Sequence, residues 1–209
     1  MKPNVLQKML GFFWRSQKFF VYLDMPNKNI QRYIDFYEQK LNEATQWGKK
    51  GKMGMVRSTM KDSVELLLDL IWETEKGGKS KKNDFVNSTS KNGYVLKFQV
   101  DRHLYTKKLV GLCECKAYLD RCFMERASSD FGRIKNGVKE KPKTFILALE
   151  DAVGSEAYNY YMDEGNIDKV FYLLDGKRSP KKPIWKQKFR KSINVDKLKE
   201  FVSFIQNIK

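Results

Sequence analysis

The sequence predicts a protein of the α/β or α+β class, because segments with helical periodicity come first and strand-like segments follow. Apolar residues recur at helical spacing in the first third of the chain. From about residue 94 onward, short apolar segments have the alternation and length of strands, with further helices between them. Helices followed by a sheet with interspersed helices are typical of this class. The 209 residues, 41% of them hydrophobic, suit a single packed domain.

The helical segments have clear apolar stripes. Tyr33, Tyr37 and Leu41 share one face of a second helix, and Val64, Leu67 and Ile71 share one face of a third. Ser58 or Thr59 is placed to cap the third helix. Residues 119–136 are expected to be a mixture of helix and loop. The expected helices cover residues 5–22, 29–46, 59–75, 155–164 and 195–207.

Two strands in the middle of the chain are expected to form an antiparallel hairpin. Residues 94–101 alternate like a strand, residues 109–118 form a second apolar strand, and the short turn near 106–108 joins them. Further strands are expected at 144–149 and 170–174. Residues 76–93, which contain five lysines, are interpreted as a long polar loop.

Charged residues within the second hairpin strand point to chemistry. Residues two apart share a face of a strand, so Glu114 and Lys116 point the same way while Cys113 and Cys115 face the core. Charges in such an apolar strand are costly unless they are paired or bind a metal ion. The strand therefore presents a candidate site on the Glu114 face.

Asp101 ends the preceding strand and is expected to join this site. With the turn centred near residue 107, Asp101 lies across from Cys113 and beside Glu114. Two carboxylates held together repel each other, and oxygen ligands of this kind suit Mg²⁺, with Mn²⁺ as a substitute. A metal there polarises a phosphodiester, and the Lys116 ammonium orients water or stabilises developing negative charge.

At these residues the chain resembles the PD-(D/E)XK nuclease superfamily. Asp101, twelve intervening residues and then Glu114-Cys115-Lys116 match its motif, and the size and layout resemble a type II restriction endonuclease. The resemblance covers about residues 58–175; Val100 stands where the family often has proline. It implies a restriction-endonuclease-like mixed sheet with a catalytic hairpin, Mg²⁺ bound by Asp101 and Glu114, and Lys116 assisting the attacking water. The implied products carry 5′-phosphate and 3′-hydroxyl ends.

Three further residues lie close to this centre in sequence. Glu65, in the helix before the hairpin, is a candidate fourth catalytic residue, as the family often has an acidic residue there. It could equally belong to an exposed helix face with ordinary charge pairs. Gln99 could contact the scissile phosphate or simply extend the sheet. His103 is interpreted as a neighbour of the centre and not as its base.

The charge balance indicates a polyanionic partner. The chain has 41 Lys and Arg against 25 Asp and Glu, a net charge of +16, which fits nucleic acid first and anionic membrane second. A lysine-rich surface without such a partner is the alternative. The candidate DNA-binding residues, each of which could contact a phosphate or solvent instead of a base, are Gln99, Arg121, Arg126, Arg133, Lys177, Arg178, Lys181 and Lys182.

The remaining expectations concern organisation and location. One nuclease domain over 1–209 is divided into a helical subregion (1–57), the catalytic core (58–175) and a basic loop with a C-terminal helix (176–209). The three cysteines are interpreted as buried thiols in a reducing compartment. Without a candidate membrane span, the protein is expected in a prokaryotic cytoplasm. A homodimer is expected to cut double-stranded DNA, with the helical first 75 residues as its contacts.

Other functions share parts of this pattern. A junction resolvase or a repair nuclease would have the same centre. A non-catalytic nucleic-acid-binding protein would use the basic segments without a metal, and an interaction protein would dock an acidic partner on them.

Overall fold

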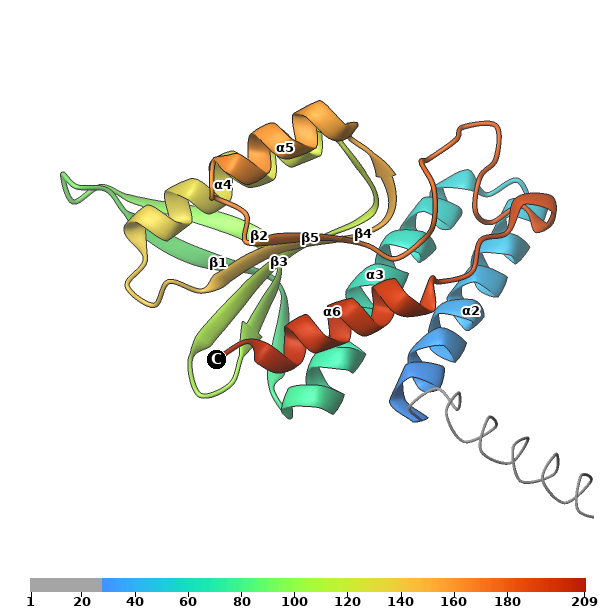
Figure 1. The fold of residues 1–209 in the computed structure, drawn as a ribbon, viewed down its shortest axis with the longest axis horizontal. Helices are drawn as coiled ribbons and strands as arrows, with labels where there is room; N and C mark the ends of the chain where they lie inside the picture. The colour runs from blue at the N-terminus through green and yellow to red at the C-terminus, as the bar shows by residue number, and fades with distance from the viewer. Residues whose placement is uncertain (1–27) are drawn as a thin grey trace, which may run out of the picture.

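The computed structural model describes residues 28–209, which form a five-stranded mixed sheet with helices on both faces (Figure 1). The sheet order is β1-β2-β3-β4-β5. The strands are β1 (Lys79–Thr89), β2 (Val95–Tyr105), β3 (Leu109–Asp120), β4 (Lys143–Ala152) and β5 (Lys169–Tyr172). The helices are α2 (Lys28–Lys49), α3 (Met53–Lys76), α4 (Arg121–Gly137), α5 (Ser155–Asp163), the 3₁₀ turn η1 (Gln187–Phe189) and α6 (Val195–Asn207).

The sheet changes from antiparallel to parallel at β3. Strands β1, β2 and β3 pair antiparallel, whereas β3, β4 and β5 pair parallel through crossovers that contain α4 and α5. Strand β4 is buried along almost its whole length, as expected for a strand covered on both faces. The expected class, a mixed central sheet flanked by helices, is confirmed.

Two apolar cores hold the layers together. One core packs α2, α3 and α6 against a face of the sheet and includes Cys113 and Cys115. The other packs α4 and α5 against the opposite face and includes Leu112 and Ile146. Figure 1 shows α4 and α5 on one side of the strands and α3 and α6 on the other. Each face of β3 therefore contacts a different helical layer.

Helix α3 begins earlier than the sequence predicts. The expected cap at Ser58 or Thr59 is wrong, because the helix starts at Met53 and Lys52 makes no side-chain cap. Thr59 is instead buried inside the helix, at 5% exposure. The helix ends at Gly77, which adopts the left-handed conformation and donates its backbone N–H to the Glu73 carbonyl.

The segment interpreted as a long polar loop is mostly strand. Strand β1 covers Lys79–Thr89, and only the short connection after it, which includes Gly93 at φ 83°, forms a turn. Most of its side chains are exposed, so the segment lacks an apolar pattern, but its backbone pairs along β2. Lysines are common on edge strands because they discourage further pairing.

Two further predicted segments are residues 119–136 and residues 5–22. Residues 119–136, expected to mix helix and loop, are a continuous helix from Arg121, capped by the Asp120 carboxylate, which accepts a 3.0 Å hydrogen bond from the Phe123 N–H. The helix expected over 5–22 lies outside the described residues. Within residues 28–209, no helix has the length and apolarity needed to cross a membrane.

Candidate active site

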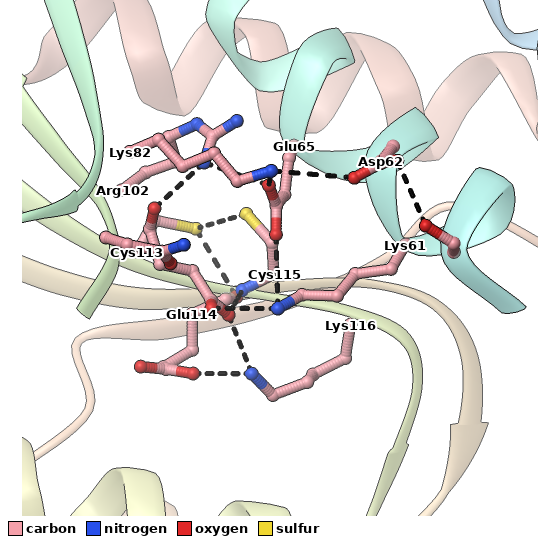
Figure 2. A network of polar contacts seen from close by, with 12 residues as sticks. Lys61, Asp62, Glu65, Lys82, Arg102, Cys113, Glu114, Cys115 and Lys116 are labelled. Carbon is pink, nitrogen blue, oxygen red and sulfur yellow. Dashed lines mark hydrogen bonds and ion pairs between the residues drawn. The ribbon is translucent and has the colours of Figure 1, made fainter. Parts of the chain in front are cut away.

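Glu114 and Lys116 lie on the same face of β3, as their spacing predicts. Lys116 Nζ lies 2.5 Å from Glu114 Oε2 (Figure 2). It also lies 2.7 Å from Asp101 Oδ2. All three side chains are partly buried. One ammonium group therefore contacts both carboxylates of the expected motif.

The hairpin register differs from the prediction by one residue. The structure pairs Arg102, and not Asp101, with Cys113, which sets Asp101 opposite Glu114. The cause is a register shift at Leu104 and Tyr105, next to the turn that joins β2 and β3. The shift brings Asp101 to the site directly, and its Oδ2 also accepts a 3.0 Å hydrogen bond from the Cys115 N–H.

The three side chains line a cavity of about 330 Å³. It lies beside α4 and next to the N-terminal half of α3. Its lining consists of Lys61, Asn83, Gln99, Asp101, Glu114, Lys116, Phe123, Arg126, Ala127 and Asp130. A larger hollow of about 1050 Å³ lies between α4 and α5. The converging carboxylates and ammonium groups make the smaller cavity the candidate active site.

The two carboxylates have opposite titration behaviour. Burial, reinforced by the negative charge of Asp101, raises the pKa of Glu114 to about 7, although Lys116 opposes this. Burial also acts to raise the pKa of Asp101, but the charge and hydrogen bond of Lys116 and the Cys115 N–H outweigh it and lower the pKa to about 2. The Asp101 carboxyl is therefore ionised at neutral pH, while Glu114 is poised between its two forms.

Lys116 remains an ammonium in this environment. Burial acts to lower its pKa, but the charges of Glu114 and Asp101 outweigh burial and raise the pKa of Lys116 above its ordinary value. A protonated lysine donates hydrogen bonds and carries positive charge, and it does not accept a proton. An ammonium in this position can orient a nucleophile or stabilise negative charge on a bound anion.

Two carboxylate oxygens at this site have the chemistry that Mg²⁺ prefers. Lys116 Nζ contacts one oxygen of each carboxylate, so a single cation can reach Asp101 and Glu114 at once. Mg²⁺ in proteins is held by one or two carboxylates and keeps several waters, which a polar cavity of this size admits. No group of three or more His, Cys, Asp or Glu side chains in residues 28–209 is arranged to hold a metal. Asp101 and Glu114 are the two carboxylates that could hold a metal ion in this cavity.

Glu65 lies behind this site and is not among the residues that line the cavity. It is 1% exposed, and its oxygens lie 3.2 Å from Lys61 Nζ, 3.0 Å from Lys82 Nζ and 3.0 Å from Arg102 Nη1 (Figure 2). Lys61 Nζ also lies 3.1 Å from Asp101 Oδ1. The Lys61 ammonium thus stands between Glu65 and Asp101 and contacts both carboxylates.

Lys61 and Arg102 were not predicted as members of this cluster. The Lys61–Glu65 spacing of four residues on one helix is the only sequence signal for Lys61. Arg102 directly follows Asp101, but a lone arginine in a strand does not reveal its partners. Its burial at 2% exposure becomes evident only when α3 packs against β2.

Gln99 and His103 occupy different environments. Gln99 is exposed, lines the cavity and donates a 3.3 Å hydrogen bond to the Asn83 carbonyl. His103 is fully buried, and burial lowers its pKa. The charge and backbone of Asp84 partly oppose this effect of burial. His103 is not among the residues that line the cavity.

The basic candidates are spread over two regions. Arg121, Arg126 and Arg133 are all exposed on α4, and Arg126 lines the cavity. The Arg178 guanidinium stacks on Tyr118, at 3.5 Å from the ring centroid. Arg121 and Lys177 line the larger hollow. Lys181 and Lys182 are exposed in the segment after β5.

The cysteines differ among themselves. Cys113 and Cys115 are buried thiols on β3, and their sulfur atoms lie 3.7 Å apart without a disulfide. Cys122 is exposed, so the interpretation of all three as buried is wrong. The reason is its position in the first turn of α4, where its side chain is exposed to solvent.

The fold and the site together define an α+β protein with a restriction-endonuclease-like sheet and a carboxylate–lysine cluster at its hairpin. No family model matches the chain. The chain is similar to the type II restriction enzyme DdeI of Desulfomicrobium norvegicum, with 28% identity over 129 residues. That match covers 54% of this chain and 53% of DdeI, so the chain spans about half the length of that relative.

A solved structure has a similar fold. The cAAA-bound form of NucC from P. aeruginosa ATCC27853 matches with a TM-score of 0.51 and 12% identity. The match covers 85% of this chain and 90% of the NucC chain. The likeness therefore extends over most of the architecture, while at this identity it concerns the fold alone.

Proposed function

We propose that this protein is a Mg²⁺-dependent endonuclease that hydrolyses DNA phosphodiester bonds in the manner of a type II restriction enzyme. The observation that carries the proposal is the convergence of Asp101, Glu114 and Lys116 in one polar cavity. The likeness to a type II restriction enzyme over 129 residues supports it, as does the net charge of +16. Mn²⁺ is expected to substitute for Mg²⁺.

Each residue of the cluster has its own proposed role. Asp101 and Glu114 would hold the metal, which polarises the phosphodiester and lowers the pKa of a bound water. Lys116 donates hydrogen bonds from its ammonium and orients the attacking water or hydroxide. The attack forms a bond to phosphorus and breaks the bond to the 3′ oxygen, which leaves a 5′-phosphate and a 3′-hydroxyl.

Two identical centres suit cleavage of both strands. A homodimer with two-fold symmetry would place one centre on each strand of a palindromic site, so we propose a homodimer as the active form. The lysines and arginines around the cavity would bind phosphates and fix the duplex across it.

The test compares plasmid cleavage by the wild-type protein with that by Asp101→Ala and Lys116→Ala, in Mg²⁺ and in EDTA. Both variants are expected to lose about 100-fold or more in rate, because each lacks an interaction made in the transition state. Lys199→Ala, a change of an exposed lysine on α6, serves as a control and is expected to cut normally. Circular dichroism checks that all variants fold.

The outcomes separate the rival functions. Equal cutting by all the proteins would assign the activity to a contaminant, and no cutting by the wild type on varied DNA would remove the catalytic assignment. Ca²⁺ is expected to support DNA binding with little cleavage. Metal-independent binding without any cleavage would favour a non-catalytic DNA-binding protein.

A further inference from the structure

The hairpin of β1 and β2 has a solvent-facing side that continues outward from the candidate active site. In its distal half, Phe85 pairs with Gln99, Asn87 with Lys97, and Thr89 with Val95. Directly paired residues share a face of the sheet. We call these residues the outer hairpin face: Phe85, Asn87, Thr89, Val95, Lys97 and Gln99.

On the opposite side of the same hairpin half, β1 packs against α4, while Leu96 of β2 is 59% exposed. Val86 and Ser88 are buried, and the Ser88 hydroxyl donates a 2.7 Å hydrogen bond to the Arg133 carbonyl. All residues of the outer hairpin face are exposed, including Phe85 at 57% and Val95 at 55%. Figure 1 shows this half of the hairpin extending away from α3 and α6. No element of the described chain packs on the outer hairpin face.

The outer hairpin face meets the cavity at Gln99. Gln99 belongs to this face by its pairing with Phe85, and it also lines the cavity that contains Asp101 and Glu114. A duplex with one phosphate in the cavity would therefore lie close to the hairpin. The surface is continuous with the proposed chemistry.

The charge of the hairpin selects a polyanion. Residues 79–97 contain five lysines and one aspartate. Lys97, at the centre of the outer hairpin face, makes no ion pair with any residue from 28 to 209. An apolar protein partner would gain little from this charge, whereas a duplex would neutralise it.

The side chains of the outer hairpin face can contact base edges. Asn and Gln amides match the donor and acceptor that adenine presents in the major groove, and threonine or phenylalanine contacts the thymine methyl group. A two-stranded ribbon fits that groove, which is about 12 Å wide. Three cross-strand pairs span about 13 Å along the strands, which corresponds to about four base pairs.

We propose that the outer hairpin face enters the major groove beside the cleaved phosphate and makes the base contacts that set the sequence preference. This proposal rests on the proposed nuclease function. Asn87 and Gln99 supply amide contacts to base edges, and Lys97 contacts a phosphate or a guanine. The arginines of α4 then serve as phosphate contacts and not as base readers.

The experiment uses the full chain in Ca²⁺ with a pool of duplexes randomised over a central window. Bound duplexes are sequenced for the wild type, Asn87→Ala and the matched control Asn159→Ala, which alters an exposed asparagine of α5. Asn87→Ala is expected to relax the preference at one or two neighbouring positions by at least about fivefold. Asn159→Ala is expected to select the same sequences as the wild type.

A second measurement follows the salt dependence of duplex binding. Lys97→Ala is expected to weaken binding and, if Lys97 contacts a phosphate, to reduce the slope of log affinity against log salt by about one. Lys199→Ala provides the control, since Lys199 is also exposed but lies on α6. Unchanged affinity and slope for Lys97→Ala together with unchanged base preference for Asn87→Ala would overturn the proposal.

Sedimentation of a Phe85→Ser, Val95→Ser double variant addresses a second copy of the chain as the occupant. A dimer that dissociates in this variant, with unchanged duplex affinity, would make the outer hairpin face a subunit interface and overturn the proposal. Plasmid cleavage distinguishes a failure of this inference from a failure of the proposed function. A wild type that cuts DNA while all hairpin variants behave like it removes only this inference, whereas a wild type that binds no duplex removes the proposed function too.

Discussion

At the scale of single residues, Glu114 links pH to the stability of the metal-free protein. Its pKa is raised from 4.5 to about 7 by burial and by the charge of Asp101, against the effect of Lys116. A group whose pKa is raised on folding contributes stability that is fully present below the unfolded pKa. That contribution is lost as the pH rises through the folded value. Raising the pH from about 4.5 to about 7 therefore lowers the free energy of unfolding.

Replacing Glu114 by glutamine is expected to stabilise the metal-free protein at high pH. At about pH 8.5 the gain in the free energy of unfolding is about 1–3 kcal/mol, because glutamine keeps the shape without the buried charge. At about pH 5 the gain is smaller, since the wild-type carboxyl is then protonated in the fold. Urea denaturation in EDTA at both pH values measures this. An equal gain at both would show that Glu114 titrates normally.

Lys61 is expected to compete with the metal for Asp101. Its ammonium lies 3.1 Å from Asp101 Oδ1 and 3.2 Å from Glu65 Oε1. Lys61→Met removes this positive charge, so Mn²⁺ binding to the DNA-free protein is expected to tighten several-fold, as measured by titration calorimetry.

Lys82→Met provides a matched control for this effect. Lys82 also pairs with Glu65, at 3.0 Å, but none of its ion pairs involves Asp101. Its replacement is expected to change Mn²⁺ affinity much less. Equal affinity changes in the two variants would mean that the charge near Glu65, and not the contact with Asp101, controls metal binding.

At the scale of elements, Arg102 joins α3 to β2 directly beside the site. Its Nε lies 2.8 Å from Asp69 Oδ1 and its Nη1 lies 3.0 Å from Glu65 Oε2, both on α3. Nη1 also donates a 2.9 Å hydrogen bond to the Asp101 carbonyl. The guanidinium therefore fixes the backbone that carries the Asp101 carboxylate against the helix that carries Lys61.

Removing the Arg102 guanidinium is expected to destabilise the fold strongly. Arg102→Met leaves the Glu65 carboxylate buried with fewer cations, and breaking such a pair costs about 3–5 kcal/mol. The double variant Arg102→Met, Glu65→Gln is expected to recover part of this loss, because it also removes the buried charge. Urea denaturation measures both.

An exposed pair on α4 serves as the reference for that experiment. Arg126 pairs with Asp130 at 3.7 Å and its side chain is 78% exposed. Arg126→Met is expected to change stability by less than about 0.5 kcal/mol. A loss for Arg102→Met that is no larger than this reference would show that the Arg102 guanidinium contributes little to the fold.

The elements that sequence predicts well are those with their own apolar pattern. The stripe of Tyr33, Tyr37 and Leu41 in α2 and the apolar run of β4 are each visible without knowledge of neighbours. Strand β1 has no such stripe, because it lies at the sheet edge and its pairing energy comes from backbone hydrogen bonds with β2. Edge strands of this kind are defined by a partner that a local pattern does not show.

At the scale of the whole molecule, the site contains residues from one strand and residues that tertiary packing brings to that strand. Glu114 and Lys116 are fixed together by the two-residue period of β3, so their contact is predictable. The position of Asp101 depends on a register shift near the turn, and the prediction missed it by one residue. Lys61 reaches the site only because α3 packs across the hairpin. Long-range packing of this kind has no signature in a local sequence window.

The net charge of +16 leads to a last prediction about the molecule as a whole. If the basic surface binds DNA, affinity for a duplex in Ca²⁺ falls steeply with salt, because each neutralised phosphate releases counterions. For 6–10 phosphate contacts, the loss between about 50 and 200 mM salt is about 10³- to 10⁵-fold. Fluorescence anisotropy over a salt series measures the slope. A slope near zero, or equal competition by polyglutamate and duplex DNA at matched charge, would instead favour a lysine-rich surface without a nucleic-acid partner or one that docks acidic proteins.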